Sequence, residues 1–560
     1  MQCRVAVRVW CGLAVSRTAR IRLRRLALPI TCASIALAVV LLIGFATPPT
    51  GDAPSHLFQT WLYRHGGFSP WNNYWYAGRY EFVTYSVFYY PLAARFGQVL
   101  VLAASAGVLC SAFALVVQRE WGRKAARGPA LAFAVTAPFV GIVSGVYPFM
   151  VASACAMLAL LFLQRRMRIA FALATFATLG FSPLAFALLV ALLAGVLLGQ
   201  RQPLVALRQN RVAFAAVLAV FVAGVLAERA FPTGAWYPYD FSDAAIVLGF
   251  SLIGLFMAGT SRRARSVRML FAAYLALNLI AFLLKSPIGS NATRLFAIGG
   301  MPLLWLAMNV GQRRSRLIVF PVLAVAMALQ IGPMVRDAYS AWNSPAAHAR
   351  YWQPAIQFLD HHSTEGYRVE AVATWGHWDA YYLARHVPLA RGWYRQDDFP
   401  QNSVLYRPGL SPIAYQNWLR SLGVRYVLLP DTALDYSSKQ EAALLLSGRS
   451  GLFEIGHTKH WRFYELPGAT PIVSAPPDEK AELELLEPDR IWLHVSGPGS
   501  YLVRVRYSPY WKATLGSACI APAPDGMMQV TASQRGLLGL EVRPGVDTVA
   551  DTMQDSDTGC

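Results

Sequence analysis

Residues 26–46 read LALPITCASIALAVVLLIGFA, an unbroken apolar run that directly follows a basic arm ending at Arg24 and Arg25. A helix of this length crosses roughly 30 Å of hydrocarbon. The run is longer than the apolar part of a secretory signal peptide, and no obvious small-x-small cleavage site follows it. We therefore predict a retained membrane anchor whose basic arm, residues 1–25, stays in the cytoplasm.

The rest of the chain has the same apolar character. Of its 560 residues, 55% are hydrophobic and 14% are charged, which is too apolar for an ordinary soluble protein. Ten further apolar segments lie at approximately 94–117, 129–146, 147–164, 169–181, 184–199, 212–229, 244–260, 268–284, 294–311 and 317–335. We predict about eleven spans within a transmembrane domain over 26–335. Alternatively, the short pair broken at Ser182-Pro183 forms one re-entrant element.

The net charge of +20 comes from arginine clusters that stand between the apolar segments. This spacing argues against nucleic-acid binding, which needs a continuous basic face. The clusters are Arg119, Arg123, Lys124 and Arg127; Arg165, Arg166 and Arg168; Arg201, Arg208 and Arg211; Arg262, Arg263, Arg265 and Arg268; and Arg313, Arg314 and Arg316. With eleven spans, every cluster falls on the side of the N-terminal arm, which the positive-inside rule assigns to the cytoplasm. The large first loop, 48–93, and everything after Arg336 are then extracytoplasmic in a multi-pass protein of the cell membrane.

After Arg336 the long apolar runs end, and polar and apolar residues are mixed. Residues 336–470 predict an external α/β domain with a strand over 367–374, a helix over 412–422 and a buried strand over 425–429. Residues 471–550 contain runs with a period of two, such as 491–495 and 501–507, and predict a β-sandwich. Residues 551–560 predict a disordered tail. The expected fold class is thus an α-helical polytopic membrane protein with an extracytoplasmic α/β plus β-sandwich region at its C-terminus.

Cysteine usage indicates no disulfide framework. Only Cys519 and Cys560 lie beyond the membrane part. A bridge between them is conceivable on an oxidising side, but two free thiols are expected because Cys560 is the last residue.

The first loop opens with the main chemical signal, Gly51-Asp52 followed by Pro54 and His56. Asp52 with Pro54 predicts a helix start, and four-residue spacing then places Asp52 and His56 on one helix face. A carboxylate and an imidazole would thus lie together at the lipid–water boundary. The alternative is that Asp52 only caps the helix and that His56 only hydrogen-bonds nearby backbone.

Further along, this loop reads GGFSPWNNYWYAGRYE at 66–81, rich in aromatic and polar residues. Candidate acceptor-binding residues outside the membrane are Trp71, Trp75, Tyr76, Glu81, Asp240 and Asp243. The aromatic residues can instead form an interfacial belt, and the two aspartates can instead cap a helix. The segment 391–398, RGWYRQDD, alternates polar and aromatic groups and is a further candidate for acceptor recognition, whereas the His and Trp residues of 375–379 are more typical of packing.

A family resemblance rests on these residues together. An anchor helix followed at once by Gly51-Asp52 and His56, then many short spans and an external C-terminal region, resembles the GT-C glycosyltransferases. Within that superfamily the sequence is similar to bacterial membrane proteins of the YfhO type and to the group labelled 6-pyruvoyl-tetrahydropterin-synthase-related. The likeness includes Leu422-Gly-Val-Arg-Tyr-Val-Leu428 and Tyr507-Ser-Pro-Tyr-Trp511. It covers most of the chain in architecture, and no pterin-synthase zinc triad accompanies the pterin label.

The resemblance implies a hexosyl- or pentosyltransferase that takes a sugar from a polyprenyl-phosphate donor among the membrane lipids. Its acceptor is a cell-envelope glycan, lipid or protein on the external face. Asp52 is the candidate base, with His56 beside it, and Arg294 and Lys285 are candidates for binding the lipid phosphate. Both cations can instead snorkel to lipid headgroups. No cofactor is expected and no D-x-D motif predicts a metal, although use of a divalent metal stays open.

Two other functions compete with this one. A transporter or flippase for a lipid-linked precursor is typified by inverted repeats and charges near mid-span, and neither is evident here. A non-catalytic envelope scaffold is the third candidate. It predicts that the acids of the first loop tolerate substitution.

Overall fold

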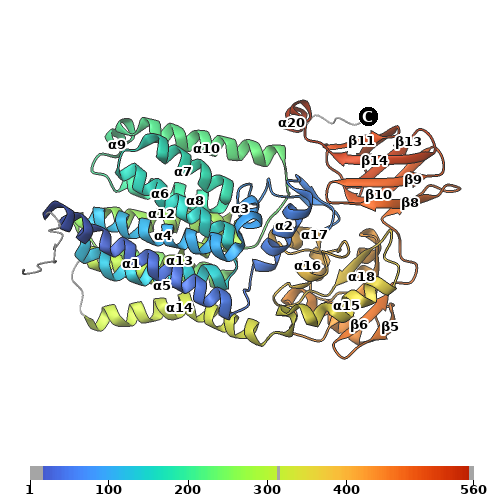
Figure 1. The fold of residues 1–560 in the computed structure, drawn as a ribbon, viewed down its shortest axis with the longest axis horizontal. Helices are drawn as coiled ribbons and strands as arrows, with labels where there is room; N and C mark the ends of the chain where they lie inside the picture. Colours follow the sequence, from blue (N-terminus) through green and yellow to red (C-terminus); the bar gives the residue numbers. More distant parts are fainter. Residues whose placement is uncertain (1–16, 312–315, 554–560) are drawn as a thin grey trace, which may run out of the picture.

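The computed structural model describes residues 17–311 and 316–553 and shows a helical bundle joined to two C-terminal domains (Figure 1). Within these residues nine helices are long and apolar enough to cross a membrane. They are α1 (Arg17–Ala46), α4 (Gln98–Trp121), α5 (Arg123–Val143), α6 (Tyr147–Gln164), α10 (Arg211–Ala230), α11 (Phe241–Ala258), α12 (Arg265–Leu283), α13 (Arg294–Val310) and α14 (Arg316–Asn343). The fold class expected from the sequence, a multi-pass helical membrane protein with a C-terminal β-rich region, is confirmed.

Two shorter helices occupy the remaining pair of predicted spans. α7 (Arg168–Phe181) and α8 (Pro183–Leu198) meet at Ser182, whose hydroxyl accepts a hydrogen bond from the Ala185 amide at 3.4 Å. Pro183 fits the first turn of α8, where no backbone donor is needed, so the break follows directly from Ser182-Pro183. α8 then bends by 118° into α9 (Pro203–Gln209). Together with the nine longer helices, α7 and α8 occupy the eleven predicted positions.

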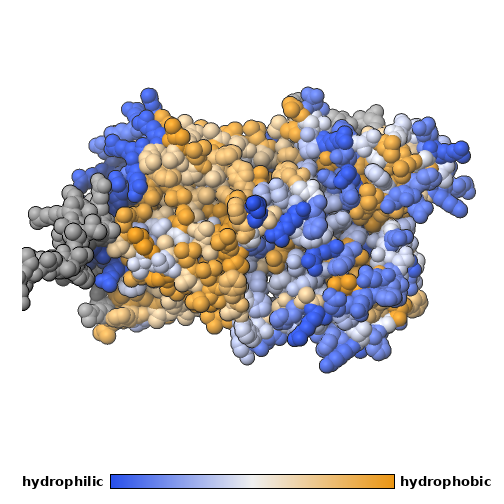
Figure 2. Space-filling model, in the orientation of Figure 1, coloured by the Kyte–Doolittle hydropathy of each residue, from blue (hydrophilic) through white to orange (hydrophobic). Residues whose placement is uncertain are grey.

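The bundle has two chemically different ends. At one end, here called the arginine end, connections between helices carry the arginine clusters that lie within the described residues. Arg263 of the α11–α12 connection donates to the Trp121 carbonyl at the end of α4. The opposite end, here called the domain end, meets the C-terminal domains. Figure 2 shows a broad apolar surface over the helices, with hydrophilic residues gathered at both ends. Exposed apolar side chains of α10 such as Phe214 and Phe221 belong to this surface, as expected of a lipid-facing belt.

The first loop contains α2 (Ala53–Gly66), the strand pair β1 (Trp71–Asn72) and β2 (Arg79–Tyr80), and α3 (Tyr89–Phe96). It lies at the domain end (Figure 1). Its aromatic residues enter three hydrophobic cores. Phe82 packs in the bundle, Trp75 packs in the α/β domain and Trp71 packs in the sandwich. The loop thus joins the three parts of the molecule.

The α/β domain that follows α14 contains one mixed sheet, ordered β3-β4-β6-β5. The strands are β3 (Arg368–Ala371), β4 (Val424–Pro430), β5 (Phe453–His457) and β6 (Trp461–Glu465). β3 and β4 are parallel and the other pairs are antiparallel. The helices are α15 (Ala349–His361), α16 (Asp379–Tyr382), α17 (Arg395–Gln401), α18 (Pro412–Ser421) and α19 (Lys439–Leu446). The expected strands and the expected helix over 412–422 are therefore present, and Gly423, with φ of +74°, follows the end of α18.

The last domain packs two four-stranded antiparallel sheets, β12-β13-β10-β7 and β11-β14-β9-β8, around an apolar core. The strands are β7 (Val473–Ser474), β8 (Ala481–Leu486), β9 (Arg490–Val495), β10 (Gly499–Arg506), β11 (Trp511–Leu515), β12 (Ala518–Pro522), β13 (Met527–Ala532) and β14 (Gly536–Val542). In β9 every second residue is buried, which is the alternation seen in the sequence.

Two expectations for the C-terminus need adjustment. Residues 546–553 form the helix α20 (Val546–Met553), so the first three residues of the predicted tail are helical, and 554–560 lie outside the described residues. Cys519 is disulfide-bonded, not the free thiol that was expected, and its partner lies outside the described residues, as does Cys560.

Candidate functional site

Asp52 is held by close backbone contact between the first loop and the turn that joins α5 to α6. The Asp52 amide donates to the Ser144 carbonyl at 3.1 Å, and a Cβ on Gly51 would lie 2.4 Å from that same oxygen. On the turn, a Cβ on Gly145 would lie 2.3 Å from the Ala53 nitrogen. Both glycines have positive φ, so a side chain at either position meets strain as well as a clash. This contact fixes where α2 begins.

Asp52 stands at the N-cap of α2, but its side chain makes no capping bond. The carboxylate instead accepts a hydrogen bond from Nη2 of Arg294 at 2.6 Å. Arg294 begins α13, and its guanidinium also donates to Oδ1 of Asn291, at 3.2 Å from Nε and 3.0 Å from Nη2. The Asp52 and Arg294 side chains are 24% and 16% exposed, so the pair is open to a ligand. The structure thus brings together two residues singled out in the sequence. The Asp52 carboxylate binds Arg294 and does not cap the start of α2.

His56 lies one turn further along α2 and is fully buried. Its Nδ1 is 3.1 Å from the Tyr90 hydroxyl. Its Nε2 has no hydrogen-bond partner among the described residues. Four tyrosine rings surround the imidazole with centroids at 5.3 to 6.1 Å, namely Tyr85, Tyr89, Tyr90 and Tyr147.

Burial dominates the electrostatics of His56. Loss of solvation lowers the pKa of His56 to about 3, while the Asp52 charge raises it and the Arg294 charge lowers it. The imidazole is therefore neutral at physiological pH. The buried imidazole packs among the four tyrosine rings, one turn along α2 from Asp52.

The segment 391–398 of the α/β domain rests on the start of the first loop. The Trp393 indole donates to the Gly51 carbonyl at 2.9 Å. The ring centroids of Tyr394 and Tyr85 are 4.8 Å apart. The Arg79 guanidinium also lies over the Tyr394 ring, with its Cζ 4.5 Å from the ring centroid. The candidate acceptor segment therefore lies next to Asp52.

Four of the other candidate acceptor residues are instead buried. Trp71, Trp75, Tyr76 and Glu81 are each at most 2% exposed. Trp75 stacks on Phe58 at 4.5 Å, and Glu81 pairs with Arg79 at 2.8 Å. The structure thus uses these residues to pack the first loop against the C-terminal domains, and none of the four offers a free surface.

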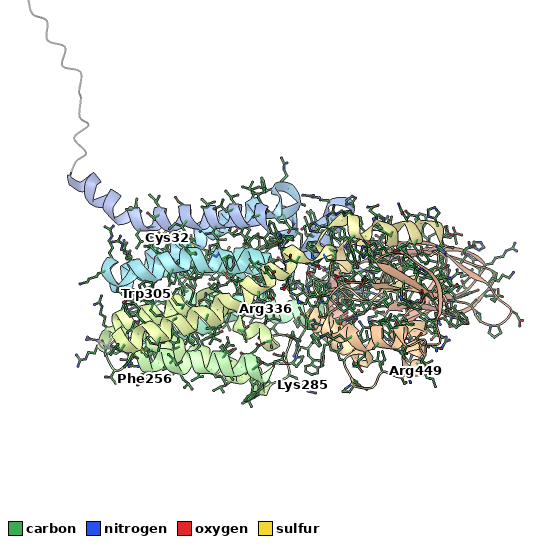
Figure 3. All side chains as sticks on the ribbon, turned by 90° about the horizontal axis from the view of Figure 1, so that it is seen from below. Cys32, Phe256, Lys285, Trp305, Arg336 and Arg449 are labelled. Atoms are coloured by element: carbon green, nitrogen blue, oxygen red, sulfur yellow. The ribbon has the colours of Figure 1, made fainter. Side chains whose placement is uncertain are left out.

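Asp240, Asp243 and Lys285 lie around the connections α10–α11 and α12–α13. Asp240 is exposed before α11, its amide donating to the Ser290 hydroxyl at 3.1 Å, and Asp243 lies in the first turn of that helix. Lys285 is also exposed, with Nζ 5.3 Å from the Trp236 ring centroid, and Figure 3 shows it at the edge of the bundle beside the C-terminal domains. Because the Trp236 amide donates to the Gln396 carbonyl at 3.1 Å, Trp236 links Lys285 to the segment 391–398.

A buried ionic cluster packs against the segment 391–398. His377 stacks on Trp393 at 3.3 Å, and its Nε2 is 3.3 Å from Oδ2 of Asp435. Arg395 donates to the same carboxylate at 2.7 Å. Although burial opposes the charge, His377 and Arg395 hold the pKa of Asp435 well below its usual range. The sequence pointed to 375–379 and 391–398 separately, but no sequence signal joins either segment to Asp435.

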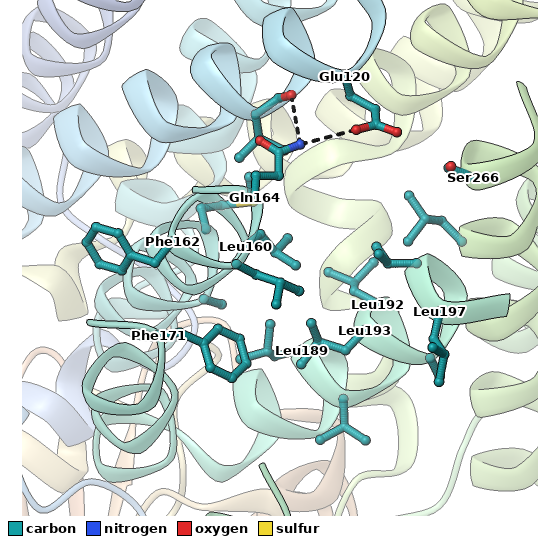
Figure 4. A pocket seen from close by; sticks show the side chains of 18 of the residues that line it. Glu120, Leu160, Phe162, Gln164, Phe171, Leu189, Leu192, Leu193, Leu197 and Ser266 are labelled. Atoms are coloured by element: carbon teal, nitrogen blue, oxygen red, sulfur yellow. Dashed lines mark hydrogen bonds between the residues drawn. The ribbon is translucent and has the colours of Figure 1, made fainter. Parts of the chain in front are cut away.

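A large apolar cavity of about 920 Å³ lies within the bundle among α4, α6, α7, α8, α10, α12 and α13. At the arginine end Glu120 and Gln164 line it, their side chains 3.5 Å apart (Figure 4). Its lining also includes Phe149 and Leu295. The Phe149 ring centroid is 5.5 Å from the Arg294 Cζ, so the Arg294 guanidinium lies next to one residue of the cavity lining.

Within the residues that the structure describes, no group of three or more His, Cys, Asp or Glu side chains is placed to hold a metal ion. Asp52 and Arg294 offer a partly exposed carboxylate and a partly exposed guanidinium.

Comparison with known proteins gives only distant likenesses. No protein-family model and no curated protein matches the chain. A mutant form of the arabinofuranosyltransferase AftD from Mycobacteria aligns with a TM-score of 0.46 and 14% identity, over 94% of this chain and 60% of that one. The unmutated AftD gives 0.42 and 13% over 94% and 57%. The oligosaccharyltransferase of Archaeoglobus fulgidus in its apo form gives 0.47 and 12% over 73% and 70%. This chain thus spans less than two thirds of the length of the AftD structures.

Proposed function

We propose that this protein is a GT-C-like membrane glycosyltransferase. It transfers a hexosyl or pentosyl group from a polyprenyl-phosphate donor to a hydroxyl of a cell-envelope glycan, lipid or protein. The observation that carries the proposal is the Asp52–Arg294 pair, whose guanidinium lies next to Phe149 in the lining of the apolar cavity.

The reaction needs a proton acceptor and a cation for the leaving group. The acceptor oxygen attacks the anomeric carbon while the bond from that carbon to the phosphate oxygen breaks. The bonding electrons leave with the lipid phosphate, and the acceptor proton moves to the Asp52 carboxylate. Arg294 stabilises the charge that develops on the phosphate. The guanidinium presents five N–H donors, so it can contact phosphate oxygens while it holds Asp52.

The cavity suits the lipid part of the donor. A polyprenyl chain in the apolar cavity, next to Phe149 and Leu295, would bring its phosphate to the start of α13. Because Lys285 is exposed, it is a candidate for a second contact with the lipid phosphate or with a lipid headgroup. His56 acts by positioning the tyrosines behind Asp52.

The acceptor would approach from the C-terminal domains. Trp393 touches the backbone beside Asp52, and its aromatic face and the neighbouring polar groups of 391–398 suit a carbohydrate. The acceptor region would rest on four buried residues, Trp71, Trp75, Tyr76 and Glu81. Asp240 and Asp243 would lie at its edge, near Ser290.

The positive-inside rule supplies the orientation. Because the arginine clusters lie at the end of the bundle remote from Asp52, we assign that end to the cytoplasm of the cell. The site and both C-terminal domains then face the extracytoplasmic side of the plasma membrane.

The decisive test is sugar transfer by the full-length protein in nanodiscs, with a radiolabelled polyprenyl-phosphate sugar and an envelope extract as acceptor. The expected result is label in the acceptor together with released polyprenyl phosphate. A flippase would move the donor across a vesicle membrane without breaking its glycosidic bond. Intact donor in every reaction, with no lipid-linked sugar accumulating in cells that lack the protein, would refute the proposal.

A further inference from the structure

A second cavity, of about 470 Å³, lies where the bundle meets the α/β domain. Its walls come from the end of α1, from α2, from the start of α4 and from the α16 region. The lining residues that carry the argument are Arg64, Arg385, Trp61, Trp378 and Tyr381. It is separate from the apolar cavity within the bundle, with which it shares no lining residue.

Among the residues that the structure describes, Arg64 and Arg385 are the only ones with a charged side chain that line this cavity. Neither guanidinium lies within ion-pair distance of a carboxylate in the part of the chain that the structure describes. Arg64 donates to the carbonyls of Ala94 at 3.1 Å and Ala93 at 3.5 Å. Arg385 donates to the Tyr381 hydroxyl at 3.4 Å, and its buried Nε has no partner among the described residues.

Two arginines with unused donors and no neighbouring carboxylate favour an anion. Phosphate oxygens match the planar fork of a guanidinium group and accept paired hydrogen bonds from it. Trp61, Trp378 and Tyr381 add an aromatic wall that suits the polar and apolar parts of a lipid head region.

The position of the cavity identifies the source of the phosphate. Gly44 and Val99 line it, and the next residues in the chain, Phe45 and Leu100, are 82% and 58% exposed. Such exposed apolar side chains at the ends of two spans belong to the surface that faces lipid. The cavity therefore lies at the boundary between hydrocarbon and headgroups.

We propose that this cavity binds the phosphate headgroup of an anionic membrane lipid, at a site distinct from Asp52 and Arg294. The inference does not depend on the proposed glycosyl transfer. The site has a structural link to His56, because Thr60 and Gln98 line the cavity and donate to the His56 carbonyl at 2.6 and 3.2 Å. Tyr147 lines the cavity as well and contacts the His56 ring at 6.0 Å. A lipid bound in this cavity would therefore contact residues that hydrogen-bond to His56 or pack against it.

The test is native mass spectrometry of the full-length protein from nanodiscs containing equal amounts of phosphatidylglycerol and phosphatidylcholine. The test variant is Arg64→Gln/Arg385→Gln, and the control is Arg95→Gln, an exposed arginine on α3 outside the cavity. We expect the wild type and the control to retain phosphatidylglycerol. The double variant should bind it about tenfold to a hundredfold more weakly, since each lost charged hydrogen bond weakens binding roughly tenfold.

The charge-retaining variant Arg64→Lys/Arg385→Lys controls for misfolding and should keep most of the binding. Two further experiments add either polyprenyl phosphate or inorganic phosphate as a competitor of phosphatidylglycerol. They identify which phosphate-bearing molecule the cavity binds. Competition by polyprenyl phosphate extends the site to that lipid, whereas equal competition by inorganic phosphate overturns the lipid assignment. Equal retention of phosphatidylglycerol by the wild type and the Gln variant, or equal retention of phosphatidylcholine, overturns the site itself. Unchanged binding in Arg294→Gln is expected, and it separates this site from the proposed donor site.

Discussion

The Asp52 carboxylate accepts a hydrogen bond at 2.6 Å from Arg294, which stands 242 positions later in the chain. One residue follows the first membrane helix and the other begins α13. The Arg294 and Asp52 side chains are 16% and 24% exposed, so the pair is neither fully solvated nor fully buried. Its position next to Phe149, a residue of the cavity lining, is the basis of the proposed role in donor binding.

Substitution Asp52→Asn removes the base but keeps the shape of the side chain. We expect the rate of sugar transfer to fall by about 10²- to 10⁴-fold, the usual contribution of a positioned proton acceptor. Initial rates with labelled donor check this, with Asp360→Asn on the exposed face of α15 as the matched control. Wild-type rates in Asp52→Asn would remove Asp52 from the mechanism.

Substitution Arg294→Lys keeps the charge but loses the planar fork that contacts two phosphate oxygens. We expect kcat/KM for the donor to fall by about tenfold or more, with little change in unfolding temperature. The control is Arg425→Lys, which alters another partly exposed pair, Arg425–Glu465, at 3.0 Å in the α/β domain. An equal change in both variants would mean that Arg294 has only a structural role.

The burial of His56 predicts a pH dependence of stability. Its pKa is about 3 in the folded protein and near 6.5 when unfolded, so above pH 6.5 neither state is protonated there. As the pH falls from 6.5 towards 3, the unfolded state binds a proton that the folded state does not, and stability decreases. The variant His56→Phe should lack this part of the loss.

The measurement is the unfolding temperature of both proteins from pH 8 to pH 4 in one detergent. His361→Phe, at an exposed histidine of α15, serves as the comparison and should follow the wild type. If His56→Phe kept the full wild-type slope, the imidazole would not be enclosed as described.

Gly145, in the turn between α5 and α6, should not tolerate a side chain. In Gly145→Ala the new methyl meets the Ala53 nitrogen, and φ of +69° costs an alanine about 1–2 kcal/mol. We expect a lower unfolding temperature and slower sugar transfer, since Asp52 must shift. Gly249→Ala, in α11 with nothing within 4 Å of the added Cβ, should be neutral or slightly stabilising. Similar behaviour of both variants in the two assays would argue against backbone positioning of Asp52.

The sequence predicted the spans well because their signal is simple: length, apolar composition and arginine clusters at alternate connections. It also singled out Asp52 and Arg294, since charged residues at the ends of apolar segments stand out. It could not predict the role of Trp71 and Trp75, because an interfacial belt and a buried interface use the same aromatic residues. Their burial depends on two C-terminal domains whose positions no local pattern encodes. The His377–Asp435 contact was unpredictable for the same reason.

The contact between Trp393 and Gly51 spans 342 positions and has a consequence for biogenesis. Gly51 and Asp52 leave the ribosome early, while Arg294 and then Trp393 emerge much later. A nascent chain therefore carries Asp52 without Arg294 until α13 is made, and the surface around Trp393 arrives later still, with the α/β domain. Truncated or stalled products retain the anchor and the carboxylate but lack the surface that covers them.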